Sequence, residues 1–290
     1  MQQLIRRWLL ITGMVLSAGA YATPGINMPY GVSPISNQIY NLHMACFYIC
    51  CVIGVLTFGA LFYSLFKYRK SKGAQAAHFH EHLAVEILWT VIPTLILIAL
   101  AIPATIVLKN IHNTDESKLT IKVTGYQWKW KYEYLDQGIS FFSNLSTPQD
   151  QINNVKPKGQ WYLLEVDNEL VVPVKTKVKL LVTADDVIHD WWVPELGVKQ
   201  DAVPGFINEN WFYINEPGTY RGQCGELCGV NHAFMPIVVK AVSQEEFDKW
   251  VSDHSKVTQN QVRDDAAMLD KARAIVNLSP ATIEAAISGV

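Results

Sequence analysis

Residues 224–235 read Cys224-Gly-Glu-Leu-Cys228-Gly-Val-Asn-His232-Ala-Phe-Met235, and this stretch constrains the fold more than any other. It places two thiols, one imidazole and one thioether within twelve residues. These soft donors suit copper, and Cys, His and Met together are the ligands of copper electron-transfer sites. Such a site needs a second imidazole, and His189 is the only other His between residues 115 and 242. A β-sandwich would bring this distant ligand to the loop.

The second Cys changes the chemistry that the site could support. A mononuclear copper site needs a single thiolate, whereas Cys224 and Cys228 could bridge two copper ions and spread the geometric change on reduction over both. A disulfide between the two thiols is one alternative in an oxidising compartment, although the adjacent His232 and Met235 disfavour it. A Cys2His2 zinc site is another. It leaves Met235 without a role, so copper is favoured.

Between about residues 112 and 242 the chain has the pattern of an antiparallel β-sandwich or barrel. Short β-like runs occur at 118–124, 161–166, 174–183 and 211–214. In the third run apolar side chains alternate with lysines, as in a strand with one buried face. Pro-Gly pairs at 204–205 and 217–218 are typical of turns between strands.

Two uncharged apolar runs precede this region, at residues 44–66 and 87–108. Each is long enough to cross a hydrocarbon core of about 30 Å as a helix. The loop between them carries Lys67, Arg69, Lys70 and Lys72, and such short basic loops face the cytoplasm. The β region should therefore lie on the opposite side of the membrane.

The two ends of the chain have separate interpretations. Residues 1–22 are predicted to be a signal peptide, with basic Arg6 and Arg7 before a short apolar stretch and an Ala-Tyr-Ala cleavage pattern at 20–22. An uncleaved anchor is the alternative. Residues 243–290 are predicted to form a helix or tail. The net charge of −2 gives no basic surface of the kind that binds nucleic acid.

The motif C-x-E-x-C-x3-H-x2-M, preceded by two membrane runs, resembles subunit II of the haem–copper cytochrome c oxidases. The resemblance extends from the first apolar run to about residue 250. It implies an α+β membrane protein with a transmembrane helical hairpin (23–111) and a cupredoxin-like antiparallel β-sandwich or barrel (112–242). It also implies a multi-pass protein of the bacterial inner (plasma) membrane, with the second domain in the periplasm.

The function implied by the resemblance is single-electron transfer. A dinuclear copper centre called CuA would accept electrons from a reduced c-type cytochrome and pass them to haem in catalytic subunit I, where O2 is reduced to water. In that family the two Cys sulfurs bridge the copper ions, the two His are terminal ligands, the Met is a weak ligand and the Glu offers its backbone carbonyl. The Glu carboxylate also binds a magnesium ion shared with subunit I. The corresponding residues are His189, Cys224, Glu226, Cys228, His232 and Met235.

The same resemblance assigns roles to residues outside this motif. Trp128, within an aromatic run that otherwise fits strand packing, would receive the electron from the cytochrome. Glu86 would lie at the entrance of a proton path, although a carboxylate at a helix start is also favoured by the helix dipole. A docking face for the cytochrome would include Asp167, Asp185 and Asp186.

Other functions compete with this interpretation. A copper-free docking subunit of a quinol oxidase would share the hairpin and β domain but lack the ligands. A periplasmic copper carrier would be expected to have Met-rich tracts, and only six Met occur. Nitrous-oxide reductase carries the same motif but needs a large His-rich domain, and this sequence of 290 residues with eight His contains none. The sequence has no C-x-x-C-H haem motif, so another protein would deliver the electron.

Overall fold

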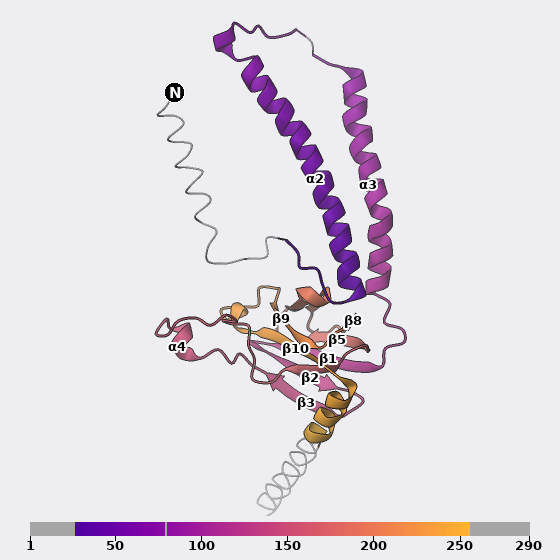
Figure 1. Ribbon diagram of the computed structural model, residues 1–290, viewed down its shortest axis with the longest axis vertical. Helices are drawn as coiled ribbons and strands as arrows, with labels where there is room; N and C mark the ends of the chain where they lie inside the picture. Colours follow the sequence, from indigo (N-terminus) through magenta and orange to yellow (C-terminus); the bar gives the residue numbers. More distant parts are fainter. Residues whose placement is uncertain (1–26, 79, 256–290) are drawn as a thin grey trace, which may run out of the picture.

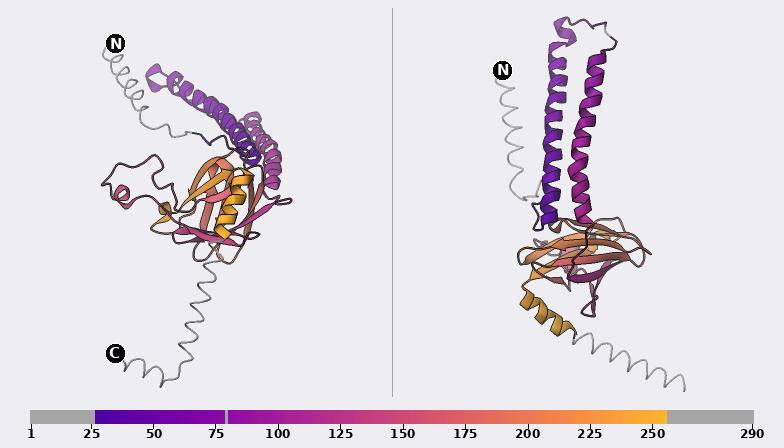
Figure 2. Two further views of the ribbon diagram at one scale, coloured as in Figure 1. Left: turned by 60° about the horizontal axis from the view of Figure 1, so that its bottom comes forward. Right: turned by 90° about the vertical axis from the view of Figure 1, so that its right-hand side faces the viewer.

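The computed structural model describes residues 27–78 and 80–255. A long helical hairpin stands on a β domain (Figures 1 and 2). The predicted signal peptide, residues 1–22, lies outside the described residues, as do residues 256–290 of the predicted C-terminal segment. Residues 244–255 form a helix that packs on the β domain through Phe247 and Trp250.

The hairpin consists of α2 (Pro34–Lys67) and α3 (Leu83–Ile111), which are long and apolar enough to cross a membrane. Their most apolar stretches have mean hydropathies of 2.3 and 2.6, and none of either stretch is buried within the chain. A helix that is apolar on all sides and uncovered by protein is suited to lipid. Both helices extend beyond the predicted uncharged runs, because polar caps at Ser33 and His82 fix where they begin.

The β domain is a sandwich of two five-stranded sheets. The first has the order β3–β2–β1–β5–β8, with β1 (Leu119–Tyr126), β2 (Lys129–Tyr134), β3 (Ile139–Ser143), β5 (Lys177–Ala184) and β8 (Asn208–Tyr213). The second has the order β4–β10–β9–β6–β7, with β4 (Leu170–Pro173), β6 (His189–Val193), β7 (Val198–Ala202), β9 (Gly218–Cys224) and β10 (Pro236–Val242). Short helices α4 (Gln149–Ile152), η1 (Lys70–Lys72), η2 (Pro194–Leu196) and η3 (His232–Phe234) lie in the connections.

The sandwich is confirmed, but its sheets are mixed rather than wholly antiparallel. β1 pairs with β5 in parallel, and β10 pairs with β4 in parallel. Parallel neighbours need long crossovers, so their pairing leaves no hairpin signal in the sequence. The predicted run at 161–166 is not a strand, because Trp161 stacks on the guanidinium of Arg221 and the chain turns there; only Val166 forms an isolated bridge.

The core lies between the two sheets and is rich in aromatic side chains. Trp130 and Tyr132 from β2 and Trp191 from β6 are completely buried. The alternation predicted along β5 is confirmed, since Val178, Leu180 and Val182 are buried and the intervening residues are partly exposed. Burial of side chains this large contributes much of the stabilisation of a sandwich.

A buried joint connects the hairpin to the second sheet. Ser33 Oγ caps α2 by accepting from Ser36 N, and it donates to the carbonyl of Leu196 at 2.9 Å. Val32 N donates to Glu195 O at 3.0 Å, and Ser33 has no exposed surface. Leu196 belongs to η2, the turn that directly follows β6. A second link runs from Trp211 Nε1 to the carbonyl of Asn110 near the end of α3.

We predict that Ser33→Ala weakens this joint. The substitution removes the cap of α2 and leaves the buried carbonyl of Leu196 without its donor, at a cost of about 1–3 kcal/mol in unfolding free energy. The measurement is the thermal unfolding midpoint of the β domain in the detergent-solubilised full chain. Ser64→Ala, at an exposed position of the same helix, is the control. Equal midpoints for the two variants would contradict the prediction.

Candidate metal centre

Three neighbouring strands of the second sheet bring the predicted ligands together. His189 is the first residue of β6 and Cys224 the last of β9, and Trp191 pairs with Cys224 across these two strands. The chain then loops through Cys228 and η3 before β10 returns beside β9. Cys224 N donates to Met235 O at 3.3 Å, which closes the loop at its base.

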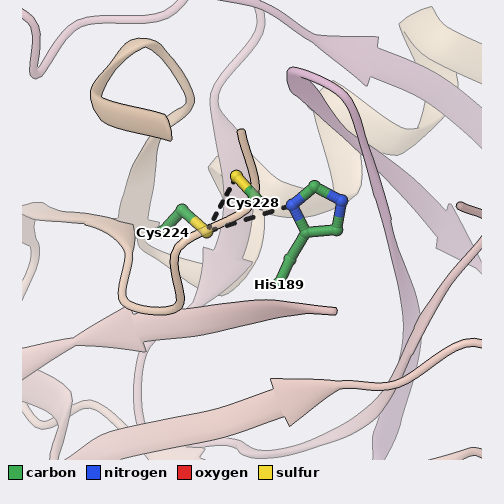
Figure 3. Close-up of side chains that lie close together, drawn as sticks. All are labelled: His189, Cys224 and Cys228. Carbon is green, nitrogen blue, oxygen red and sulfur yellow. Dashed lines mark hydrogen bonds between the residues drawn. The ribbon is translucent and has the colours of Figure 1, made fainter. Parts of the chain in front are cut away.

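The donor atoms converge at this loop, and Figure 3 shows three of the residues that supply them, His189, Cys224 and Cys228. The two Cys sulfurs are 3.8 Å apart. His189 Nδ1 is 3.9 Å from Cys224 Sγ, and His232 Nδ1 is 3.5 Å from Cys228 Sγ. Met235 Sδ is 3.5 Å from Cys228 Sγ, and the carbonyl of Glu226 is 3.3 Å from Cys224 Sγ. The structure thus brings all six predicted ligands into one cluster, with one imidazole beside each sulfur.

Both thiols are free and buried. Burial and the neighbouring Cys224 raise the pKa of the Cys228 thiol to about 12, so in the metal-free protein this thiol is protonated at neutral pH. A metal that binds here must displace that proton, because the thiolate is the ligand. His189, Cys224 and Cys228 are the one group of His, Cys and acidic side chains in the described residues that could hold a metal ion.

The His189 ring is oriented by its surroundings. Its Nε2 lies 2.9 Å from Asp186 Oδ1, which leaves Nδ1 directed at Cys224. Burial raises the pKa of Asp186, but hydrogen bonds from His189 and from the backbone N–H groups of Val187 and Gln127 outweigh this and hold the pKa below its usual value. A carboxylate on the far nitrogen of a ligating His fixes its ring and tautomer. Asp186, predicted to lie on a docking face, therefore orients the ring of the predicted ligand His189.

We predict that Asp186→Ala weakens metal binding without unfolding the chain. The His189 ring loses the acceptor that orients it, and loss of such a partner typically lowers metal affinity about 10- to 100-fold. Competition with a copper chelator measures the affinity. Asp185→Ala, one residue away and exposed, is the matched control. Equal affinities in the two variants would show that the contact at Asp186 is dispensable.

Gly125 gives the His189 ring the space it occupies. A Cβ at Gly125 would lie 2.7 Å from His189 Cδ2 and 3.0 Å from its Cγ. Such distances are far below van der Waals contact, so any side chain in this part of β1 would displace the ring. Apart from the glycine at the head of the aromatic run, no local pattern indicates this close approach.

We predict that Gly125→Ala lowers copper occupancy. The methyl group forces the ring away from Cys224, and a buried overpacking of this kind also costs about 1–3 kcal/mol. Copper content after reconstitution, by elemental analysis, tests the substitution. Gly138→Ala is not an adequate control because of its positive φ of 63°, whereas Gly159→Ala, in an open loop with no contact under 3.7 Å, is. Full occupancy in Gly125→Ala would contradict this account.

Trp128 lies in the turn between β1 and β2. It rests against the loop 224–235, which carries five of the predicted ligands and is called the metal loop below. A Cβ at Gly229, the residue after Cys228, would come within 3.0 Å of Trp128 Cζ2, so the indole rests on the main chain of this loop. Gln127 Nε2 donates to the carbonyl of Cys228 at 2.8 Å. Sequence reasoning missed Gln127, because nothing local distinguishes it from other exposed amides.

The three predicted docking carboxylates gather at this end of the first sheet. Gly125 pairs with Ala184, so Asp185 and Asp186 follow β5 beside the turn that holds Trp128. Asp167 lies near the end of β3, where its carboxylate accepts from the N–H and side-chain amide of Asn144 at 2.7 and 2.8 Å. Asp185 is exposed, whereas Asp186 is engaged with His189.

Glu86 lies apart from the predicted cluster. It is in the first turn of α3 and accepts from His82 N at 3.0 Å, which is a helix-capping contact far from the metal loop.

Asp190, which sequence reasoning did not single out, has no exposed surface and pairs with Lys199 at 3.0 Å. Its main-chain carbonyl accepts from Gly225 N at 3.0 Å, so it fixes the start of the metal loop to β6.

Comparison with known proteins gives consistent matches. A family model described as the cytochrome c oxidase subunit II periplasmic domain matches residues 119–242, and one described as its transmembrane domain matches residues 22–107. A probable cytochrome c oxidase subunit 2 of Rickettsia bellii is 40% identical over 257 residues, covering 87% of this chain and 94% of the relative. Cytochrome c oxidase subunit 2 of Arabidopsis thaliana is 38% identical, covering 86% and 96%. The solved periplasmic domain of cytochrome oxidase subunit II (CoxB) of Bradyrhizobium japonicum shares 45% identity with a TM-score of 0.45, covering 49% of this chain and 97% of that domain.

The fold and the site define a class: a membrane-anchored β-sandwich protein with a buried Cys–His–Met centre at one end of its sheets. The extent of the sequence matches narrows this class to one family. The chain belongs to the cytochrome c oxidase subunit II family, a family of subunits of an oxidoreductase. The resemblance seen in the sequence is thereby confirmed.

Proposed function

We propose that this chain holds a dinuclear copper centre, CuA, and is the subunit through which electrons enter a haem–copper oxidase. The donor would be a c-type cytochrome and the acceptor haem in the catalytic subunit. One observation carries the proposal: the side chains of His189, Cys224, Cys228, His232 and Met235 and the carbonyl of Glu226 meet in a single cluster.

The cluster fits two metal ions better than one. Two sulfurs 3.8 Å apart, each with its own imidazole nearby, form a nearly symmetric set in which each sulfur can serve both ions. Met235 Sδ beside Cys228 and the Glu226 carbonyl beside Cys224 each supply a further donor. Bound there, a pair of copper ions would take up and release one electron at a time.

The protein's contribution is a rigid set of ligands. His189, Cys224 and Met235 are fully or almost fully buried and lie at strand ends held by backbone pairing. Ligands that move little between redox states lower the reorganisation that electron transfer requires. A zinc site would need only four of these donors, and a disulfide would leave the imidazoles and the thioether unused.

The surroundings support specific partners. Trp128, which rests against the loop at Gly229, would receive the electron. The acidic residues Asp167 and Asp185, at the same end of the first sheet, would attract a basic cytochrome and make association salt-sensitive. Asp186 contributes its charge to the same surface while it holds His189. The exposed carboxylate of Glu226 is the proposed magnesium ligand at the contact with subunit I.

The membrane setting completes the proposal. The chain would reside in the bacterial inner membrane, with the β domain in the periplasm and the basic loop at 67–72 in the cytoplasm. Glu86, at the start of α3 beyond that loop, would lie where protons enter the complex from the cytoplasmic side. Its capping contact with His82 leaves one carboxylate oxygen available for that role.

We predict two copper ions per chain sharing one unpaired electron when the full-length chain is reconstituted with copper in detergent. Elemental analysis gives the copper count, and electron paramagnetic resonance reports whether the electron is shared. Cys228→Ser should abolish the shared-electron signal because it removes one bridging sulfur. Cys46→Ser, in membrane helix α2, should leave the signal unchanged.

Other results would support the competing functions. A chain that binds no copper yet assembles into an oxidase would be a docking subunit. A single copper ion, exchanged readily with a chelator, would indicate a copper carrier. Binding of zinc alone, or a Cys224–Cys228 disulfide that persists under reducing conditions, would contradict the assignment of a dinuclear copper centre.

A further inference from the structure

We propose that Gln127 is a positioning residue for electron transfer. Through the backbone carbonyl of Cys228 it clamps the β1–β2 hairpin, which carries Trp128, to the proposed copper-ligand loop 224–235. The inference rests on the proposed function, since it concerns the step in which Trp128 passes an electron to the centre. It assigns the efficiency of that step to a side chain that neither binds the metal nor belongs to the aromatic route.

The clamp has two attachment points on one residue. The side-chain Nε2 of Gln127 donates to Cys228 O at 2.8 Å, and its backbone N donates to Asp186 Oδ2 at 2.7 Å. Asp186 in turn contacts His189 Nε2 through its other oxygen. The residue before Trp128 is therefore hydrogen-bonded to one ligand directly and to a second ligand through a single carboxylate.

Trp128 cannot hold this position by its own polar contact. Among the residues that the structure describes, its indole Nε1 has no hydrogen-bond partner although the atom is buried. The ring rests instead on Gly229, whose φ of 124° and lack of a Cβ permit the close approach. Flat contact against a main chain resists sliding weakly, so the directed bond from Gln127 to the adjacent Cys228 carbonyl fixes the register of the two loops.

The position of the Gln127 side chain is itself informative. Gln127 is exposed, and an exposed amide ordinarily gains little by leaving water for a protein partner. Its amide nevertheless turns back to the metal loop, where a Cβ at Gly229 would lie 3.1 Å from Nε2. The same contact shortens the covalent and hydrogen-bonded route from the hairpin to the Cys228 ligand. Loss of the contact opens a gap across which electrons must pass through space.

The test uses Gln127→Met in the assembled oxidase. Methionine keeps the length and bulk of the side chain but has no donor, and the backbone bond to Asp186 is retained, so the hairpin stays folded. After rapid photoreduction of bound cytochrome c, we expect the first electron transfer to slow on the order of tenfold, as small misplacements of reacting groups commonly cost. The KM for cytochrome c, the copper content and the paramagnetic spectrum should be unchanged.

Two further readouts separate positioning from general damage. Reduction by hexaammineruthenium(II), a small diffusible reductant that does not use the hairpin, should keep its parental rate. In the metal-free full chain, hydrogen exchange of the segment 226–234 should speed up, because the carbonyl clamp is lost. Gln160→Met, the same change at an exposed loop position, should alter none of these quantities.

The outcomes distinguish this inference from the function on which it rests. Trp128→Phe serves as the reference for a broken aromatic route. A slow Trp128→Phe with a parental rate in Gln127→Met would overturn the clamp alone. Parental rates in both variants would overturn the route through Trp128 and the clamp with it. Loss of copper or a raised KM in Gln127→Met would instead make Gln127 a support of the ligand loop or a docking residue, and would equally reject the proposal.

Discussion

The antiparallel pairing of β6 with β9 is the constraint on which the metal centre depends. It sets Trp191 opposite Cys224, so His189, two residues earlier on the same face of β6, points toward the sulfur at the end of β9. The bond from Gly225 N to Asp190 O extends this pairing into the first residue of the loop. A shift of one residue in this register would turn His189 to the other face of the sheet and leave the sulfurs with one imidazole.

Backbone hydrogen bonds thus position most of the proposed ligands. β10 returns beside β9 with Pro236 opposite Gln223, which puts Met235 at the base of the loop that Cys224 begins. Strand pairing holds the donor atoms close together, and ligands positioned in advance lose little chain entropy when a metal binds. The loop between the two Cys is short, and Gln127 ties its end at Cys228 to the first sheet as well. Asp186 in turn accepts from Gln127 N.

The features that could be predicted from the sequence are those carried by a short stretch of the chain. Five of the six proposed ligands lie in one motif of twelve residues, His189 is the only other His between residues 115 and 242, and the two membrane helices lie in uncharged runs, so each was predictable from the sequence. The parallel pairings, the space at Gly125 and the clamp at Gln127 were not, because each joins segments that lie far apart in the chain. Asp186 was assigned to the surface alone, since only the folded chain shows that its carboxylate faces His189.

The short segment 189–196 links the metal centre to the membrane. It begins with the proposed ligand His189 and ends at Leu196, whose carbonyl accepts from the buried cap of α2. β6 is paired on both sides, with β9 and β7, and η2 follows it without an intervening loop, so this connection has no flexible part. The proposed transfer to an acceptor in the bilayer requires the cluster to keep its height above the membrane, because electron transfer weakens steeply with distance. The joint at Ser33 fixes that height through one strand, and the same strand orients the ligand.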